Sequence, residues 1–305
     1  GDKRLLALDV EMEYMFSTWF DVGFLDLRRI TWDSPASLIE KLIKYEAVHD
    51  IRSWADAKNR LDADRRCYGF FHPRLPDEPL IFVEVAFTTA MADSITPLLD
   101  EEAPPADPAR CSTAVFYSIS NAQPGLRGVS FGDSLIKRVV DTLKAELPRL
   151  KVFSTLSPIP GLRSWLTEQA PTLLERTAPK QRAELARALK PAPLGAESVL
   201  AALEDPAALD ASSPLRQWLM QCGAVYLGRE MADGKPRDAV ARFHLGNGAR
   251  VERINWAADL SAKGQRQSLG LMVNYLYDLR RLDRHRSQLA QGRIPVSSAV
   301  EALLF

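Results

Sequence analysis

The chain has 305 residues, of which 46% are hydrophobic, and this is enough to bury a sizeable core, which argues against a disordered protein. Its 39 basic and 39 acidic residues cancel, so no overall positive charge draws it to nucleic acid or to an acidic membrane surface. No apolar run approaches the roughly 20 residues that cross a bilayer, and no apolar signal core opens the chain, so we expect a cytoplasmic protein.

Two helices are predicted to open the chain. From Lys3 to Asp26 the apolar residues recur at three- and four-residue spacing, as one buried helix face requires. The phrase Asp33-Ser-Pro-Ala then indicates the start of a second helix, with a proline in its first turn. The first helix is therefore expected to pack on another part of the protein.

Three strands are predicted next, because β-branched and aromatic residues gather in short runs. The runs are Cys67 to His72, Pro79 to Thr89 and Ser112 to Ser120. Between the second and third runs, residues 100–109 are acidic and carry three prolines, which is typical of a surface loop. The three strands are candidates for a central sheet.

A glycine-bearing loop follows the third strand and leads into an amphipathic helix that begins near Leu135 and ends before Pro148. Leu150 to Leu156 is a further short apolar strand, and Ser157 follows it directly. The order of strand, helix and strand predicts a parallel crossover. Ser157 would then lie at the carboxyl end of a strand, where open α/β sheets place their ligands.

The remaining sequence predicts more helices and a hairpin. Residues 163–225 contain Ala- and Leu-rich stretches broken by prolines, which suggests a helical insertion. Strand character returns at Ala239 to Leu245, and an Asn-Gly turn joins this strand to a partner at Val251 to Trp256. Apolar spacing predicts a last helix from Gln265 to Leu289. The sequence thus indicates an α/β (α+β) fold, with a mixed central sheet flanked by helices.

The glycine-bearing loop has the form of a phosphate site. Backbone N–H groups at a helix start attract anions, and glycines let phosphate oxygens approach the chain closely. The spacing Arg-Gly-x-Ser-x-Gly resembles the pyrophosphate loop of the acetyltransferase superfamily abbreviated GNAT, with Ser130 in place of the middle glycine. A tight strand-to-helix turn is the competing interpretation, but the flanking strand and helix favour binding of the CoA pyrophosphate. The candidate binding residues are Arg127, Gly128, Val129, Ser130, Phe131, Gly132 and Asp133.

Five phrases, read in order, resemble the malonyl-CoA decarboxylases. They are Phe116-Tyr-Ser-Ile-Ser, Gly125-Leu-Arg-Gly-Val-Ser-Phe-Gly, Leu156-Ser-Pro-Ile-Pro-Gly, Phe243-His-Leu-Gly-Asn-Gly-Ala and Arg253-Ile-Asn-Trp. The resemblance runs from about Trp19 to Tyr277 and is weakest from 165 to 225. It implies a GNAT-like catalytic domain over residues 19–305, with residues 1–18 as a helix at the junction with an absent N-terminal helical domain.

The same resemblance implies decarboxylation of malonyl-CoA to acetyl-CoA and carbon dioxide, with Ser157 and His244 as the catalytic pair. An enolate forms as the carbon–carbon bond breaks, so such a site needs oxyanion donors and a proton source. Ser157 is expected to contact the malonyl carboxylate or to relay its proton, and His244, an imidazole that titrates near neutral pH, to be the acid. From local sequence alone, turn capping by Ser157 and a structural role for His244 are the competing interpretations.

The resemblance assigns two further residues to substrate binding. Tyr277 aligns with a tyrosine that lines the family's active site, and Ser118 is placed near the acyl group by the fold analogy. Because Tyr275 and Tyr277 are two apart on a predicted helix, we expect only Tyr277 to reach the site. Core packing of the tyrosine and pairing of the serine with a neighbouring strand are the alternatives.

No cofactor is expected, because the thioester carbonyl of malonyl-CoA is itself the electron sink. The cysteines and histidines show no metal-ligand spacing, so no metal is expected either. A CoA-dependent acyltransferase of the GNAT type is the main alternative function, and a non-catalytic CoA-binding scaffold is the third. The resemblance also implies a homo-oligomer, either a dimer or a tetramer, and a place in fatty acid and malonate metabolism.

Overall fold

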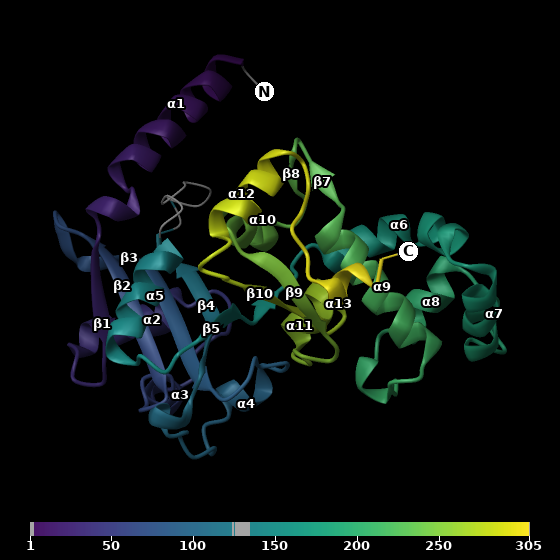
Figure 1. Cartoon of the computed structure of the whole chain (residues 1–305), viewed down its shortest axis with the longest axis horizontal. Helices are drawn as coiled ribbons and strands as arrows, with labels where there is room; N and C mark the ends of the chain where they lie inside the picture. Colours follow the sequence, from purple (N-terminus) through teal and green to yellow (C-terminus); the bar gives the residue numbers. More distant parts are fainter. Residues whose placement is uncertain (1–2, 124, 126–134, 305) are drawn as a thin grey trace. The chain divides into compact units, whose positions relative to one another are not determined.

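The structure is a computed structural model, and it describes residues 3–123, 125 and 135–304 (Figure 1). The chain divides into two compact units. Gly1–Met91 and Pro97–Phe153 form unit 1, whereas Ala92–Thr96 and Ser154–Phe305 form unit 2. Within the described ranges, no helix combines the length and the apolar character that crossing a membrane requires.

Unit 1 is built on four antiparallel strands that lie side by side in Figure 1. They are, in order, β1 (Asp26–Ile30), β2 (Arg65–His72), β3 (Leu75–Thr88) and β4 (Thr113–Asn121). Strand β2 is buried except at His72, and β3 is buried from Pro79 to Phe87, which explains the near-continuous apolar sequence of these stretches. The three strands predicted from the sequence are confirmed.

The helices that precede β5 (Val152–Thr155) are α1 (Lys3–Trp19), α2 (Ala36–Tyr45), α3 (Trp54–Asn59), α4 (Thr96–Leu99) and α5 (Leu135–Glu146). Helix α2 packs on the sheet through Ile39 and Leu42, which join Cys67 and Phe82 in one buried cluster. Helix α5 confirms the predicted amphipathic helix and buries its apolar face. The acidic segment 100–109 is a loop, as predicted, apart from a 3-10 turn at Pro108–Arg110.

Helix α1 does not bury the face that its apolar spacing predicts. The helix ends at Trp19 instead of near Asp26. Leu5, Leu8 and Trp19 have exposed fractions of 64%, 52% and 59%. The spacing therefore predicts the helix correctly, but the described residues leave much of its apolar side uncovered.

Unit 2 is organised around strand β10 (Met272–Leu276). This strand pairs antiparallel with β9 (Arg250–Asn255), with β6 (Ser157–Pro158) and with the end of β5. Val273 lies opposite Ser157 in this pairing. A small separate sheet joins β7 (Met231–Ala232) and β8 (Lys235–Pro236). Strand β10 thus holds the segment that carries Ser157.

Helices make up most of the rest of unit 2. The first four confirm the predicted helical insertion: α6 (Leu162–Arg176), α7 (Pro179–Ala188), α8 (Ala196–Ala202) and α9 (Pro214–Gly228). The later ones are α10 (Ala239–Gly246), α11 (Ala262–Ser268), α12 (Leu282–Ala290) and α13 (Ser298–Glu301). Both units combine strands with helices, so the predicted α/β class is confirmed.

The predicted strand from Ala239 to Leu245 is wrong, because this segment is helix α10. Asp238 caps the helix: its Oδ1 accepts hydrogen bonds from the backbone N–H groups of Val240 and Ala241, each at 2.9 Å. The Asn-Gly pair ends the helix instead of turning a hairpin, and Gly248 has a φ of +87°. The predicted hairpin partner is a strand, β9, but it pairs with β10.

The predicted last helix from Gln265 to Leu289 is also wrong, because helix, strand and helix share this range. Helix α11 ends at Ser268, and Leu269 and Gly270 then adopt φ values of +53° and +79°. Strand β10 follows and is buried on both faces, so its sequence shows no apolar-polar alternation. A helical period fits such a run equally well, which explains the error.

Candidate active site

Three of the residues predicted for the site form one row of hydrogen bonds in unit 2. Ser157 Oγ lies 3.2 Å from Nε2 of His244, and Nδ1 of the same ring lies 2.7 Å from the hydroxyl of Tyr277. The three side chains are buried, with exposed fractions of 5%, 3% and 3%. Residues far apart in the sequence therefore meet at the two nitrogens of one imidazole.

Ser157 is held in place by strand pairing and by Thr155. The Ser157 hydroxyl donates to Oγ1 of Thr155 at 2.9 Å. Oγ1 of Thr155 also accepts from the backbone N–H of Tyr275 at 3.0 Å. Thr155 is thus part of the site, although no sequence motif marks it. Threonine is ordinary in strands, so its presence at residue 155 carries no functional signal.

His244 lies in the last turn of α10, and its surroundings keep it uncharged. Its ring stacks on that of Tyr275, with ring centres 4.7 Å apart and planes inclined by 25°. Burial lowers the pKa of His244 from its ordinary 6.5 to about 3, because the charged form loses its hydration. The imidazole is therefore neutral near pH 7, and the expectation that it titrates near neutrality is wrong for the free protein.

One arrangement of protons satisfies the whole row. Burial raises the pKa of Tyr277 well above its usual range, so its hydroxyl keeps its proton. Because Ser157 donates to Thr155, Nε2 carries the imidazole proton and donates to Ser157, while Nδ1 accepts from Tyr277. Ser157 and His244 thus carry one O–H and one N–H group side by side, and in the free protein both groups donate within the row. A bound oxyanion could accept from these groups in place of their present partners.

Tyr275 in β10 and Tyr277 just after it both contact His244. The expectation that only Tyr277 reaches the site is therefore wrong. That expectation placed them on a helix. They lie instead on a strand and at the residue after it, where positions two apart point to the same side. Tyr275 stacks on the imidazole and Tyr277 binds Nδ1. The Tyr275 hydroxyl is buried and has no hydrogen-bond partner among the described residues.

Known proteins resemble this chain over most of its length. The family model of the malonyl-CoA decarboxylase C-terminal domain matches residues 23–305. The chain belongs to the malonyl-CoA decarboxylase family. The resemblance carried by the five sequence phrases is therefore confirmed.

Relatives within the malonyl-CoA decarboxylase family include proteins with solved structures. The mitochondrial malonyl-CoA decarboxylase of Anser anser anser is 40% identical over 277 residues, which cover 88% of this chain and 55% of that protein. The crystal structure of malonyl-CoA decarboxylase from Cupriavidus metallidurans is 50% identical, with a TM-score of 0.87 over 98% of this chain and 72% of that one. The enzyme structure from Rhodopseudomonas palustris is 45% identical, with a TM-score of 0.83 over 99% and 71% of the two chains. The chain spans about half the length of the curated relatives it matches.

The phosphate loop predicted for this malonyl-CoA decarboxylase family member, residues 127–133, lies outside the described residues. The elements on either side of it are present, since β4 ends at Asn121 and α5 begins at Leu135. Binding of the CoA pyrophosphate by this loop stays a prediction. The cytoplasmic location and the homo-oligomer also stay predictions, and the curated relatives named above include mitochondrial proteins.

Ser118 belongs to unit 1, where it contacts a buried carboxylate. Its hydroxyl lies 2.7 Å from each carboxylate oxygen of Glu46, and Ser120 donates to the same group at 3.0 Å. The backbone N–H groups of Val48 and His49 also donate to Glu46, at 2.7 and 2.9 Å. These contacts give Ser118 a structural role, and its predicted role in binding the acyl group is untested.

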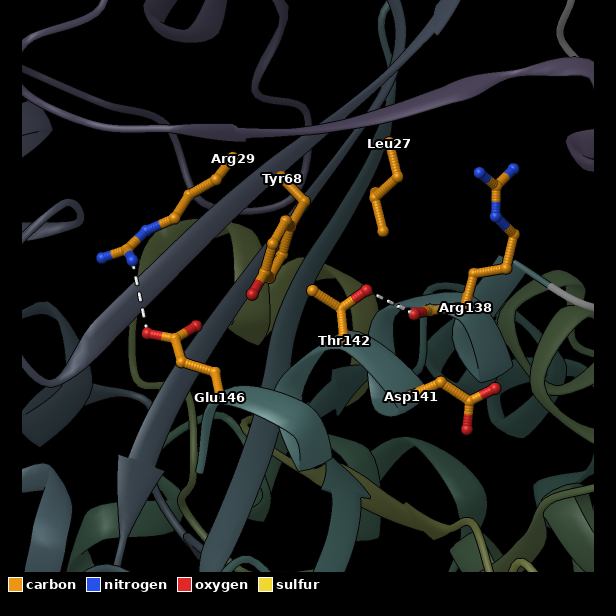
Figure 2. Close-up of a pocket in the computed structure, with 7 residues that line it drawn as sticks. All are labelled: Leu27, Arg29, Tyr68, Arg138, Asp141, Thr142 and Glu146. Atoms are coloured by element: carbon orange, nitrogen blue, oxygen red, sulfur yellow. Dashed lines mark hydrogen bonds and ion pairs between the residues drawn. The ribbon is translucent and has the colours of Figure 1, made fainter. Parts of the chain in front are cut away.

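Unit 1 also contains a hollow of about 430 Å³ between β1, β2 and α5 (Figure 2). Its two arginines and Glu146 have protein partners. Arg29 lies 3.3 Å from Oε1 of Glu146, and Nε of Arg66 donates to that oxygen at 2.9 Å. Arg138 donates to the carbonyl of Leu25 at 2.7 Å. We assign no ligand to this hollow. Its lining residues are Leu27, Arg29, Tyr68, Arg138, Asp141, Thr142 and Glu146.

Proposed function

We propose that this protein decarboxylates malonyl-CoA to acetyl-CoA and carbon dioxide. Membership of the family supports the proposal, because relatives that are 40% and 50% identical carry the name malonyl-CoA decarboxylase. The observation that carries it is the buried row of hydrogen bonds from Tyr277 through His244 to Ser157. Such a row can stabilise an oxyanion and supply a proton, which are the two needs of this reaction.

The reaction breaks one carbon–carbon bond and consumes one proton. The electron pair of that bond moves into the thioester carbonyl, carbon dioxide leaves, and the enolate of acetyl-CoA remains. A proton then adds to the enolate carbon. Because the thioester carbonyl accepts the electrons, the proposal involves no cofactor.

His244 is the acid in this proposal, and Ser157 binds the malonyl carboxylate. Burial keeps the imidazole neutral in the free protein. A carboxylate brought next to it raises the pKa of the imidazole, because an opposite charge favours the protonated form. His244 then takes up a proton from solution with the substrate and gives the proton on Nε2 to the enolate carbon. The imidazole is then neutral with its remaining proton on Nδ1, and proton exchange with solvent restores the Nε2–H form of the free protein.

Tyr277 suits both protonation states of His244. Its hydroxyl donates to Nδ1 in the free protein and accepts from Nδ1–H whenever that nitrogen carries a proton. Burial raises the pKa of Tyr277, so the hydroxyl keeps its own proton in either state. Tyr277 can therefore fix the orientation of the ring throughout the cycle.

Incubation of the full chain with malonyl-CoA as the only substrate tests the proposal. We expect acetyl-CoA and carbon dioxide in equal amounts, measured by chromatography and by capture of labelled carbon dioxide. The variant His244→Ala should lose most of the turnover and keep its affinity for CoA, and unchanged turnover would remove His244 from the mechanism. Product that forms only with an added amine would instead support the acyltransferase. Binding of CoA without turnover would support the scaffold.

A further inference from the structure

Asp238 joins the helix that carries His244 to the segment that carries Ser157. The Asp238 side chain lies just before α10, is 2% exposed, and caps the helix through Oδ1. Its partners there are the backbone N–H groups of Val240 and Ala241. Asp238 therefore fixes the first turn of the helix whose last turn carries the imidazole.

The same carboxylate also contacts the end of the Ser157-Pro-Ile-Pro-Gly segment. The backbone N–H of Gly161 donates to it, and the hydroxyl of Tyr226 donates to Oδ2 at 3.4 Å. The packing here is tight. A methyl group added at Gly161 would lie 2.2 Å from the Tyr226 hydroxyl oxygen and 3.8 Å from Asp238 Oδ2. Gly161 is thus a position where a side chain has no room.

We propose that Asp238 is a positioning residue, which sets the contact between Ser157 and His244 by binding the segment of one and the helix of the other. This inference rests on the proposed function. Ser157 and His244 are 87 residues apart in the sequence, so their 3.2 Å contact depends on what joins the two segments. Strand β10 fixes the segment at Ser157, and Asp238 fixes its far end at Gly161.

An anion at residue 238 explains more than helix capping does. Serine and asparagine cap helices about as well as aspartate. The Asp238 carboxylate, however, accepts from four donors: two at the start of α10, one at Gly161 and one at Tyr226. A carboxylate has two acceptor oxygens, whereas an amide has one oxygen and one nitrogen that only donates. Asparagine would therefore keep the cap and lose the bond from Gly161.

The variant Asp238→Asn separates these two roles in the full chain. We expect kcat for malonyl-CoA decarboxylation to fall at least about tenfold with KM changed less than about threefold, since misplaced groups slow chemistry more than they weaken binding. Rates are expressed per folded protein, with the folded fraction taken from circular dichroism. The control is Ser261→Ala, which removes the cap of α11, where Ser261 accepts from Gly264 N–H at 3.1 Å. Ser261→Ala should keep the wild-type kcat.

A second pair of variants perturbs the contact between Ser157 and His244 at the Gly161 end of the serine segment. Gly161→Ala places a methyl group against the Tyr226 hydroxyl, so it should displace the segment and lower kcat, again with little change in KM. Tyr226→Phe in the same chain removes the clashing oxygen and leaves the ring carbon at 3.3 Å. The double variant should therefore recover most of the kcat. Because rates are expressed per folded protein, a change in the folded fraction alone would not produce this rescue.

The outcomes distinguish the two proposals. If the wild-type protein produces no acetyl-CoA from malonyl-CoA, the proposed function fails, whatever the variants do. If the wild type is active, a wild-type kcat in a folded Asp238→Asn variant overturns the positioning role. If Asp238→Asn does not fold, Gly161→Ala decides: a wild-type kcat in a folded Gly161→Ala variant overturns the role.

Discussion

Acidification should destabilise this protein more than a variant that lacks the His244 imidazole. The pKa of His244 is about 3 in the folded protein and 6.5 as its ordinary value. Between these values the unfolded chain binds a proton that the folded protein excludes, so the free energy of unfolding rises with pH. The contribution of the neutral imidazole is thus complete above pH 6.5 and is lost as the pH falls toward 3.

The expected loss can be worked from the two pKa values. A change from about pH 7.5 to about pH 4.5 ends roughly two pH units below the pKa of the imidazole in the unfolded chain. Each of these units changes the free energy of unfolding by about 1.4 kcal/mol. His244 should therefore cost the protein about 2.5 kcal/mol over this range. Buried carboxylates also respond to pH, so the measurement needs a matched variant. His244→Gln keeps hydrogen-bonding groups near Ser157 and does not titrate.

Urea unfolding of both proteins at both pH values gives the result. The wild type should lose about 2.5 kcal/mol more than His244→Gln between the two conditions, with equal dependence on urea. The pH-induced change in the free energy of unfolding is compared between the two proteins. Contributions from groups that titrate alike in both proteins therefore cancel. Losses that agree within about 0.5 kcal/mol would refute the conclusion that the folded protein holds this imidazole buried and neutral.

Three further results follow from the site. Ser157→Ala should lower kcat at least about a hundredfold without weakening CoA binding, as steady-state kinetics and calorimetry would measure; an unchanged kcat would exclude Ser157 from the chemistry. Tyr275→Phe keeps the ring stacked on His244 and deletes a buried hydroxyl without a described partner, so the free energy of unfolding should stay equal or rise by about 1 kcal/mol in urea. A clear loss of stability would show that this hydroxyl has a partner. A thioether analogue of malonyl-CoA keeps the carboxylate and lacks the carbonyl. Its binding near pH 7 should be coupled to uptake of a measurable fraction of a proton by the protein, whereas binding of CoA should be coupled to none. Calorimetry in buffers of different ionisation enthalpy measures this uptake, and equal values for the two ligands would contradict a carboxylate that protonates His244.

Unit 1 shows what local patterns predict well. Its strands are short apolar runs bounded by turn residues, and α5 has helical spacing closed by Pro148. In both cases the local preference agrees with the tertiary structure. Helix α1 shows the limit of the same reasoning, because apolar spacing predicts the helix but not whether its face is covered within the chain.

The candidate site was predictable only in part. Ser157 and His244 were selected by the family phrases around them, since each has an ordinary structural role when considered alone. Asp238 did carry a local signal: an aspartate directly before Ala-Val-Ala is a typical helix start, and it would have predicted α10 correctly. Thr155 and Tyr275 carried no such signal, because their roles depend on contacts with residues distant in the sequence.

Whether residues 272–276 form a helix or a strand decides the composition of the site. On a helix, Tyr275 and Tyr277 would be about 200° apart around the axis and only one would face His244. As a strand, β10 turns both toward the imidazole, and through Val273 it also pairs with Ser157. The apolar sequence allows either conformation, and the choice depends on β9 and β6, which lie elsewhere in the chain. One short strand thus aligns the serine with both tyrosines. The histidine lies on α10 instead, and Asp238 caps that helix. Asp238→Asn is therefore the most informative change outside the row of Ser157, His244 and Tyr277.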